Sequence, residues 1–247
     1  MTLIVEGTLD TLPKAVLRDL AELARSDGER LVIIDNGYDL PSTIADPQVD
    51  LLLDPEFGIW DFFADHLSHQ DLARAAEAIT ASPDGGLFFH QVTALLVEEF
   101  LHSEAGEPAG SLAGVRQRAL SLQPGQVRSW LERLELASGD EADRLSFSVL
   151  DYLVLSCSFC PYEGKRPRVS LRRWLDGTPG SILFMACGPG GRDPMIAAAI
   201  ACIVELEAAA GRTVQLAGKP DETGQNIAAR RALQVAGGSP WTGRKLS

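Results

Sequence analysis

Short hydrophobic runs typical of buried parallel strands occur early and late in this 247-residue chain. Residues 2–6 (TLIVE) and 30–35 (RLVIID) are rich in β-branched residues, and 181–187 (SILFMAC) is apolar almost throughout. Between the first two runs, apolar residues recur at helical spacing over residues 13–26. This order predicts a strand, a helix and a second, parallel strand joined by a right-handed crossover.

The middle of the chain has a different periodicity. Apolar positions follow helical spacing in six successive segments, and Ser68 stands where it could cap the second of them. The segments are 60–66, 71–81, 87–103, 112–122, 126–136 and 140–155. We therefore expect residues 57–158 to form an all-helical insertion into an α/β core made of residues 1–56 and 159–247.

The α/β pattern returns after this block. A helix is predicted over residues 193–210, and its apolar run Met195–Val204 is too short to cross a membrane, so we expect it to pack in the core. Residues 49–53 and 213–217 predict further short strands, and residues 227–235 a last short helix.

Charge and cysteine content narrow the possible functions. The chain has 34 acidic and 22 basic residues, a net charge of −12, whereas proteins that bind nucleic acid usually present a basic surface to the phosphates. Direct DNA binding is therefore not expected. The first residues lack the basic and apolar pattern of a secretion signal, and four cysteines are too few and too clustered for a disulfide framework. These features predict a cytoplasmic protein without a membrane segment.

Four further segments occur in an order that is typical of a known protein family. Residues 31–40 (LVIIDNGYDL) place Asp35 and Asp39 at the end of a strand, and residues 52–63 (LLDPEFGIWDFF) supply a turn followed by a tryptophan. Phe88-Phe89 precedes a long helix, and residues 170–175 (SLRRWL) precede an apolar strand. In this order the chain resembles the nucleotide-binding domain of TraD-like type IV coupling proteins, the ring ATPases of conjugation and type IV secretion. The resemblance implies a P-loop NTPase-like core, with a mostly parallel sheet flanked by helices and a helical insertion that meets cargo.

The phosphate-binding loop of that family is degenerate here. The family's loop has the form GxxxxGK[ST]. In the matching residues 7–15 (GTLDTLPKA), Gly7 and Lys14 remain, and Leu12 or Pro13 replaces the second glycine. Proline lacks the N–H that would face a phosphate, and Ala15 follows Lys14 where a hydroxyl should bind Mg²⁺. Asp10 adds a negative charge to a loop that should hold an anion. We expect no nucleotide cofactor to be held there.

The acidic pair that should end a later strand is also missing. Residues 213–217 run into Gly218-Lys219-Pro220, and Asp221-Glu222 come too late to hold Mg²⁺ at the strand end. The sequence therefore predicts a non-hydrolysing relative that acts as an accessory or scaffold protein and binds a protein partner through its insertion. Because nucleotide helps to assemble the family's rings, we expect a monomer or dimer. A remnant without selected activity is a third reading of the same losses.

A glycine-rich loop supports an alternative. Gly188, Gly190, Gly191 and Arg192 lie between a predicted strand and helix, where backbone N–H groups and the helix dipole favour anions. A Rossmann-like protein that binds a nucleotide or another small molecule could use this loop. The glycines also suit a plain tight turn, with Asp193 as the helix cap.

Cysteine and histidine pairs raise the question of metal binding. Cys157 and Cys160 have no second ligand pair at motif spacing, so we expect ordinary buried thiols. His66 and His69 lie beside several aspartates but at a predicted helix break, which favours solvated surface. His90 and His102 are expected at polar edges of a helix. No metal site is predicted.

Overall fold

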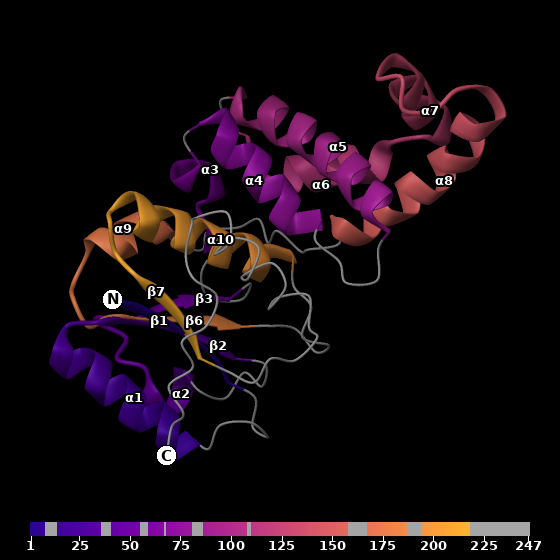
Figure 1. Cartoon of the computed structure of the whole chain (residues 1–247). Coiled ribbons are helices and arrows are strands. Elements are labelled where there is room, and N and C mark those ends of the chain that lie inside the picture. Colours follow the sequence, from indigo (N-terminus) through magenta and orange to yellow (C-terminus); the bar gives the residue numbers. More distant parts are fainter. Residues whose placement is uncertain are drawn as a thin grey trace.

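The computed structural model describes most of the chain. The described residues are 1–7, 14–35, 41–54, 59–66, 68–80, 86–107, 110–157, 167–186 and 194–217. They form a sheet with helices on both faces and a helical arm that extends from one of these faces (Figure 1).

The central sheet has five strands in the order β3-β6-β2-β1-β7, and every pairing is parallel. The strands are β1 (Thr2–Gly7), β2 (Arg30–Asp35), β3 (Leu51–Leu53), β6 (Ile182–Ala186) and β7 (Val214–Ala217). The prediction of a parallel, α/β core with the unit β1, α1 (Lys14–Asp27) and β2 is confirmed.

Alternate residues of the central strands serve opposite faces of the sheet, because side chains of a strand point to each side in turn. Leu31 and Ile33 of β2 pack in the cluster with α1, whereas Val32 and Ile34 join the cluster that contains α10 (Pro194–Ala209). Figure 1 shows α1 and α10 on opposite sides of the sheet. The near-continuous apolar runs of β2 and β6 follow from burial on both faces.

The helix α10 is buried between two layers. It lies over the sheet and also packs against α4 (His69–Thr80), so residues on all sides of its middle turns are buried from Ile196 to Val204. An apolar surface all round is expected for such a helix. The prediction that this helix packs in the core is therefore confirmed. The insertion contacts the core through the packing of α4 on α10.

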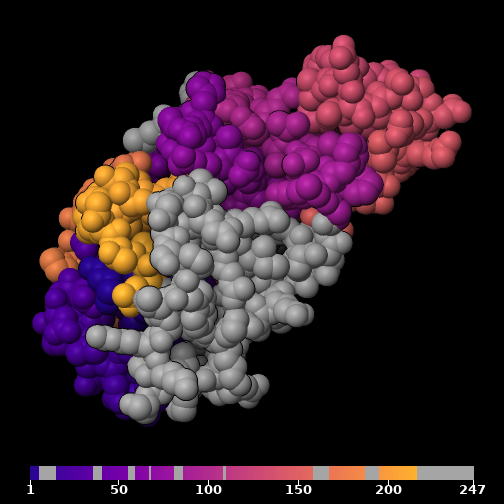
Figure 2. Space-filling view, in the orientation of Figure 1, coloured from indigo at the N-terminus to yellow at the C-terminus, as the bar shows by residue number. Residues whose placement is uncertain are grey.

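The insertion contains most of the remaining helices. They are α3 (Phe62–Asp65), α4, α5 (Leu87–Ala105), α6 (Leu112–Ser121), α7 (Pro124–Arg133) and α8 (Gly139–Ser156). Ser68 caps α4 as predicted, since its Oγ accepts the N–H of Asp71 at 3.2 Å. Figure 2 shows the α7–α8 end projecting away from the core. One hydrophobic cluster runs from the sheet through α10 into this arm.

A two-stranded parallel pair joins the start of the insertion to the segment that follows it. β4 (Ile59–Trp60) pairs with β5 (Arg168–Val169), and α9 (Leu171–Asp176) follows β5. The predicted helix at residues 60–66 was thus wrong at its start, where Trp60 is in a strand. A short helix, α2 (Pro41–Ile44), precedes β3. Across the described ranges, no helix has the length and apolarity that a membrane span requires.

Candidate functional site

The carboxyl ends of the parallel strands meet along one edge of the sheet, where α/β proteins usually bind ligands. Gly7 at the end of β1 is level with Asp35 of β2, and Asp35 is level with Ala186 of β6. The side chain of Asp35 is buried at the centre of this edge. The ends of β1 and β6, which precede residues 8–13 and 187–193, therefore lie on the same edge of the sheet.

The structure places only the ends of these loops. Gly7 is the last residue of β1, and Lys14 is the first residue of α1, so the six residues between them form the strand-to-helix connection. Gly188, Gly190, Gly191 and Arg192 lie outside the described residues, between β6 and α10. Asp39, Asp193, Asp221 and Glu222 also lie outside them.

The sequence at this edge differs from that of a magnesium–triphosphate site in two places. An anion could approach the N-terminus of α1. The connection before α1 nevertheless has the sequence TLDTLP, and Ala15 stands in the first turn of the helix. β7 has the sequence VQLA and carries no carboxylate of its own. A loss of Mg²⁺ and phosphate binding at this edge is therefore a prediction from the sequence.

The junction between the insertion and α9 is built around a buried carboxylate. Asp65 Oδ1 accepts hydrogen bonds from Ser170 Oγ at 2.7 Å and Arg172 N at 3.1 Å. Asp65 Oδ2 accepts from Leu171 N and Trp60 Nε1, both at 2.7 Å. Three of these bonds come from the start of α9 and one from Trp60 of β4, so Asp65 of α3 joins the start of the insertion to the segment that follows it. Ser170 Oγ caps α9 by accepting the N–H of Arg173, and Asp65 accepts the N–H groups of Leu171 and Arg172.

Two histidines expected at the surface are buried. The His66 ring stacks on Phe62, and its Nδ1 lies 2.8 Å from the carbonyl oxygen of that residue, to which it donates. Burial is the main cause of a lowered pKa of His66. His90 is also buried, with Nδ1 3.0 Å from the carbonyl oxygen of Thr80. The predictions of a solvated His66 and of an edge position for His90 were therefore wrong, because backbone carbonyls provide partners inside the arm.

His69 and His102 form an exposed pair in which His69 Nδ1 lies 3.2 Å from His102 Nε2. Glu98 Oε1 is 3.5 Å from the same Nε2 of His102. Over the part of the chain that the structure describes, no group of three His, Cys, Asp or Glu side chains is arranged to hold a metal ion.

The two described cysteines are buried free thiols, as expected for Cys157. Burial raises the pKa of Cys157 to about 12 and also raises the pKa of Cys202, so neither forms a reactive thiolate near neutral pH. Cys160 lies outside the described residues.

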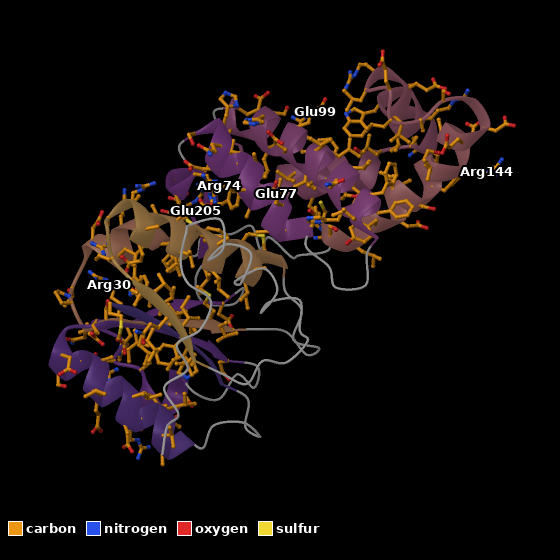
Figure 3. All side chains as sticks on the ribbon, viewed as in Figure 1. Arg30, Arg74, Glu77, Glu99, Arg144 and Glu205 are labelled. Atoms are coloured by element: carbon orange, nitrogen blue, oxygen red, sulfur yellow. The ribbon has the colours of Figure 1, made fainter. Side chains whose placement is uncertain are left out.

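An ion pair links the insertion to the core. Arg74 of α4 lies 3.3 Å from Glu205 Oε1 of α10, and Glu77 stands on the same helix as Arg74 (Figure 3). Burial raises the pKa of Glu205 to about 7, and Arg74 opposes this shift. The interface between α4 and α10 therefore contains a carboxyl group that titrates near neutral pH.

Comparison with known proteins points to one family. A family model described as "Type IV secretion-system coupling protein DNA-binding domain" matches residues 3–220. No curated protein sequence gives a significant match.

Solved structures with a similar fold belong to the bacterial plasmid coupling protein TrwB. The unbound TrwBdeltaN70 structure has a TM-score of 0.64 at 22% identity, over 87% of this chain and 54% of that one. The complex of TrwB with the GTP analogue GDPNP has a TM-score of 0.67 at 23% identity, over 87% and 55%. The complex with ADP and Mg²⁺ has a TM-score of 0.65 at 24% identity, over the same shares. The chain thus spans about half the length of these structures, and the likeness establishes a common fold.

Proposed function

Because the chain belongs to the type IV secretion-system coupling protein DNA-binding domain family, we propose that it is an accessory or scaffold protein of conjugation or type IV secretion. In this role it does not hydrolyse nucleotides, and it binds a protein partner through its helical insertion. The observation that carries the proposal is the connection from Gly7 to Lys14. It joins a strand and a helix in the order of a phosphate loop, but lacks the second glycine and the hydroxyl that a phosphate loop requires.

The insertion is suited to a protein partner by its charge and position. Residues 57–158 contain 15 acidic and 6 basic residues, so they hold −9 of the chain's −12. The arm projects from the sheet, and its α7–α8 end is farthest from it (Figures 1 and 2). A strongly acidic arm favours partners with basic surfaces and repels a DNA backbone.

Direct DNA binding is not part of the proposal, although the family's description includes it. Affinity for DNA depends on lysine and arginine side chains that neutralise phosphates. A fluorescence anisotropy titration with labelled single- and double-stranded DNA at low salt tests this. We expect no saturable binding below about 10⁻⁴ M, weaker than ordinary non-specific DNA binding. A micromolar, salt-dependent Kd would contradict the proposal.

A cytoplasmic location completes the proposal. It is supported by the four cysteines, which are too few and too clustered for the disulfide framework of a secreted protein.

A thermal-shift screen against ATP–Mg²⁺, GTP–Mg²⁺, NAD and phosphate tests the nucleotide part. We expect no rise in Tm with either triphosphate at millimolar concentration. A rise with ATP–Mg²⁺ that is lost in Lys14→Ala would show a working phosphate loop and contradict the proposal. A rise that is lost in Arg192→Ala and kept in Lys14→Ala would favour the alternative, a small-molecule or nucleotide site in the loop after β6.

A further inference from the structure

The turn between α7 and α8 combines exposed leucines with exposed carboxylates. We call residues 132–141 (ERLELASGDE) the tip patch. Leu134 and Leu136 are 43% and 37% exposed and stand two residues apart. The exposed acidic residues of the patch are Glu132, Glu135, Asp140 and Glu141. The patch lies at the end of the arm, where α7 is labelled in Figure 1.

Glu135 occupies a backbone position that ordinarily belongs to glycine. Its φ is +56°, and it is the one non-glycine residue with positive φ among the described residues. The N–H of Leu136 donates to Leu131 O at 3.0 Å, and the N–H of Glu135 donates to Glu132 O at 3.1 Å. These two bonds form a Schellman motif at the end of α7, in which a left-handed glycine is strongly preferred at the position of Glu135. The chain thus holds a carboxylate where glycine would make the turn more stable, and strain of this kind is found at functional sites.

Two arginines near the tip patch, Arg128 and Arg133, have acidic partners, whereas Arg144 is exposed and forms no ion pair with any residue that the structure describes. Arg128 lies 2.8 Å from Asp143 and 3.1 Å from Glu132, and Arg133 lies 3.6 Å from Glu99. Asp140 and Glu141 are explained in part by the first turn of α8, where acidic residues favour the helix dipole. Glu135 has no such local role, and it forms no ion pair with any residue that the structure describes.

We propose that the tip patch is the place on the insertion where a basic amphipathic helix of the partner binds, with apolar side chains over Leu134 and Leu136 and basic side chains around Glu135. This inference rests on the proposed function, because it specifies the partner of the same insertion. The charge of the tip patch favours a basic helix as the partner. A second copy of this chain would bring one acidic patch against another, whereas the charge of a basic helix is complementary to the patch. The two leucines supply the apolar contact, and the carboxylates supply the surrounding charge.

Binding of a defined peptide tests the proposal. The probe is an 18-residue helix with leucine on one face and lysine elsewhere, and its control carries glutamate in place of lysine. Each peptide is titrated into the ¹⁵N-labelled full chain. With the lysine peptide, we expect the largest shifts of amide signals at residues 132–141. Shifts centred elsewhere on this acidic protein, or equal shifts with the glutamate peptide, would overturn the proposal.

Substitution of Glu135 gives the most specific readout. In Glu135→Gly we expect Tm to rise by about 2–4 °C as the backbone strain is relieved, while the Kd for the lysine peptide weakens by roughly threefold to tenfold. Leu134→Ser should weaken the Kd about tenfold or more, and Leu23→Ser, which changes a leucine exposed on α1, should leave it unchanged. An unaltered Kd in both Glu135→Gly and Leu134→Ser would refute the assignment. Nucleotide hydrolysis does not enter this measurement, so its outcome is separate from that of the thermal-shift screen.

Discussion

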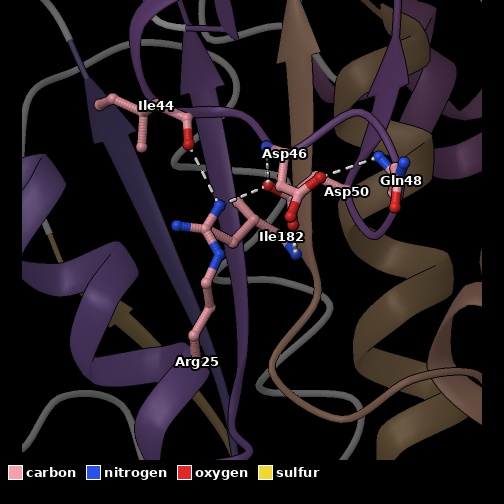
Figure 4. Close-up of polar contacts among 6 residues, drawn as sticks. All are labelled: Arg25, Ile44, Asp46, Gln48, Asp50 and Ile182. Atoms are coloured by element: carbon pink, nitrogen blue, oxygen red, sulfur yellow. Dashed lines mark hydrogen bonds and ion pairs between the residues drawn. The ribbon is translucent and has the colours of Figure 1, made fainter.

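The guanidinium group of Arg25 lies 2.5 Å from Oδ2 of Asp50, and this ion pair joins α1 to the turn before β3 (Figure 4). The same carboxylate accepts the N–H of Ile182 through Oδ1 and the N–H of Asp46 through Oδ2, both at 2.8 Å. Asp50 is buried and Arg25 is partly exposed. One carboxylate therefore fixes the start of β6, the turn before β3 and the helix below the sheet.

Removal of this carboxylate should destabilise the core. In Asp50→Ala the backbone N–H of Ile182 loses its acceptor inside the protein and Arg25 loses its partner. We expect a loss of about 3 kcal/mol in the free energy of unfolding, measured by urea denaturation. Asp46→Ala is the matched control, because its side chain is exposed and, among the described residues, accepts one hydrogen bond, from the N–H of Gln48; it should cost less than about 1 kcal/mol. Equal losses in the two variants would show that the Asp50 network is unimportant.

Gly114 of α6 should not tolerate a methyl group. A Cβ at this position would lie 2.0 Å from Oε2 of Glu104. That carboxylate is held by Ser111 N at 3.1 Å and Arg118 Nε at 2.7 Å, so it cannot move without losing both bonds. We expect Gly114→Ala to lower the free energy of unfolding by about 2 kcal/mol.

Gly125 of α7 provides the control for this substitution. Apart from its chain neighbours and the backbone of its own helix, no described atom lies within 4 Å of a Cβ built at Gly125, so alanine meets open space. Gly125→Ala should stabilise the protein by up to about 1 kcal/mol because alanine favours helices. A similar effect of both substitutions in chemical denaturation would argue against the contact between Gly114 and Glu104.

Stability should depend on pH through Glu205. Its pKa is raised from an ordinary value of 4.5 to about 7 in the folded protein. Between pH 4.5 and 7 the folded state keeps a proton on Glu205 that the unfolded state has lost. The contribution of Glu205 to the free energy of unfolding is therefore complete below about pH 4.5 and is lost as the pH rises through 7. Glu205→Gln should remove the dependence and reduce the difference in unfolding free energy between pH 5 and pH 8 by about 1–2 kcal/mol, a value lowered for partial exposure.

His66 also contributes to the pH dependence of stability in the wild-type protein. Because its pKa is lowered, its contribution to the free energy of unfolding increases with pH, opposite to that of Glu205. The comparison of variant with wild type isolates Glu205, and Glu22→Gln on the exposed face of α1 is the control. If the profile of Glu205→Gln matches that of the wild type, the carboxyl group titrates at its ordinary pKa and the account of this interface is wrong.

The sequence predicted those elements whose residues carry a long or strong pattern. The apolar runs of β2 and β6 and the helical spacing of α4, α5 and α8 were sufficient, because burial imposes these periods directly. β4 and β5 were missed, since two residues have no measurable period and their pairing joins positions 59–60 to 168–169. The order of the five strands in the sheet could not be predicted from hydrophobic periodicity either, because it depends on contacts between segments that are distant in the sequence.

The polar residues were harder to predict than the apolar ones. His66 and Asp65 both looked like members of a solvated acidic surface, yet their partners are the carbonyl oxygen of Phe62 and the backbone of α9. A polar side chain is buried when the fold supplies a partner, and a single sequence does not show that partner. The departures of residues 7–15 from the phosphate-loop pattern could be read from the sequence, because that pattern consists of residue types at fixed spacing. Whether nucleotide binds there stays a prediction.

Phosphate release from ATP–Mg²⁺ by the purified full chain tests the central claim most directly. The connection from Gly7 to Lys14 lacks the second glycine and the hydroxyl of a phosphate loop, and a functioning loop needs both. We predict that the wild-type protein and Lys14→Ala release phosphate no faster than a buffer control. Turnover by the wild-type protein that disappears in Lys14→Ala would contradict the account.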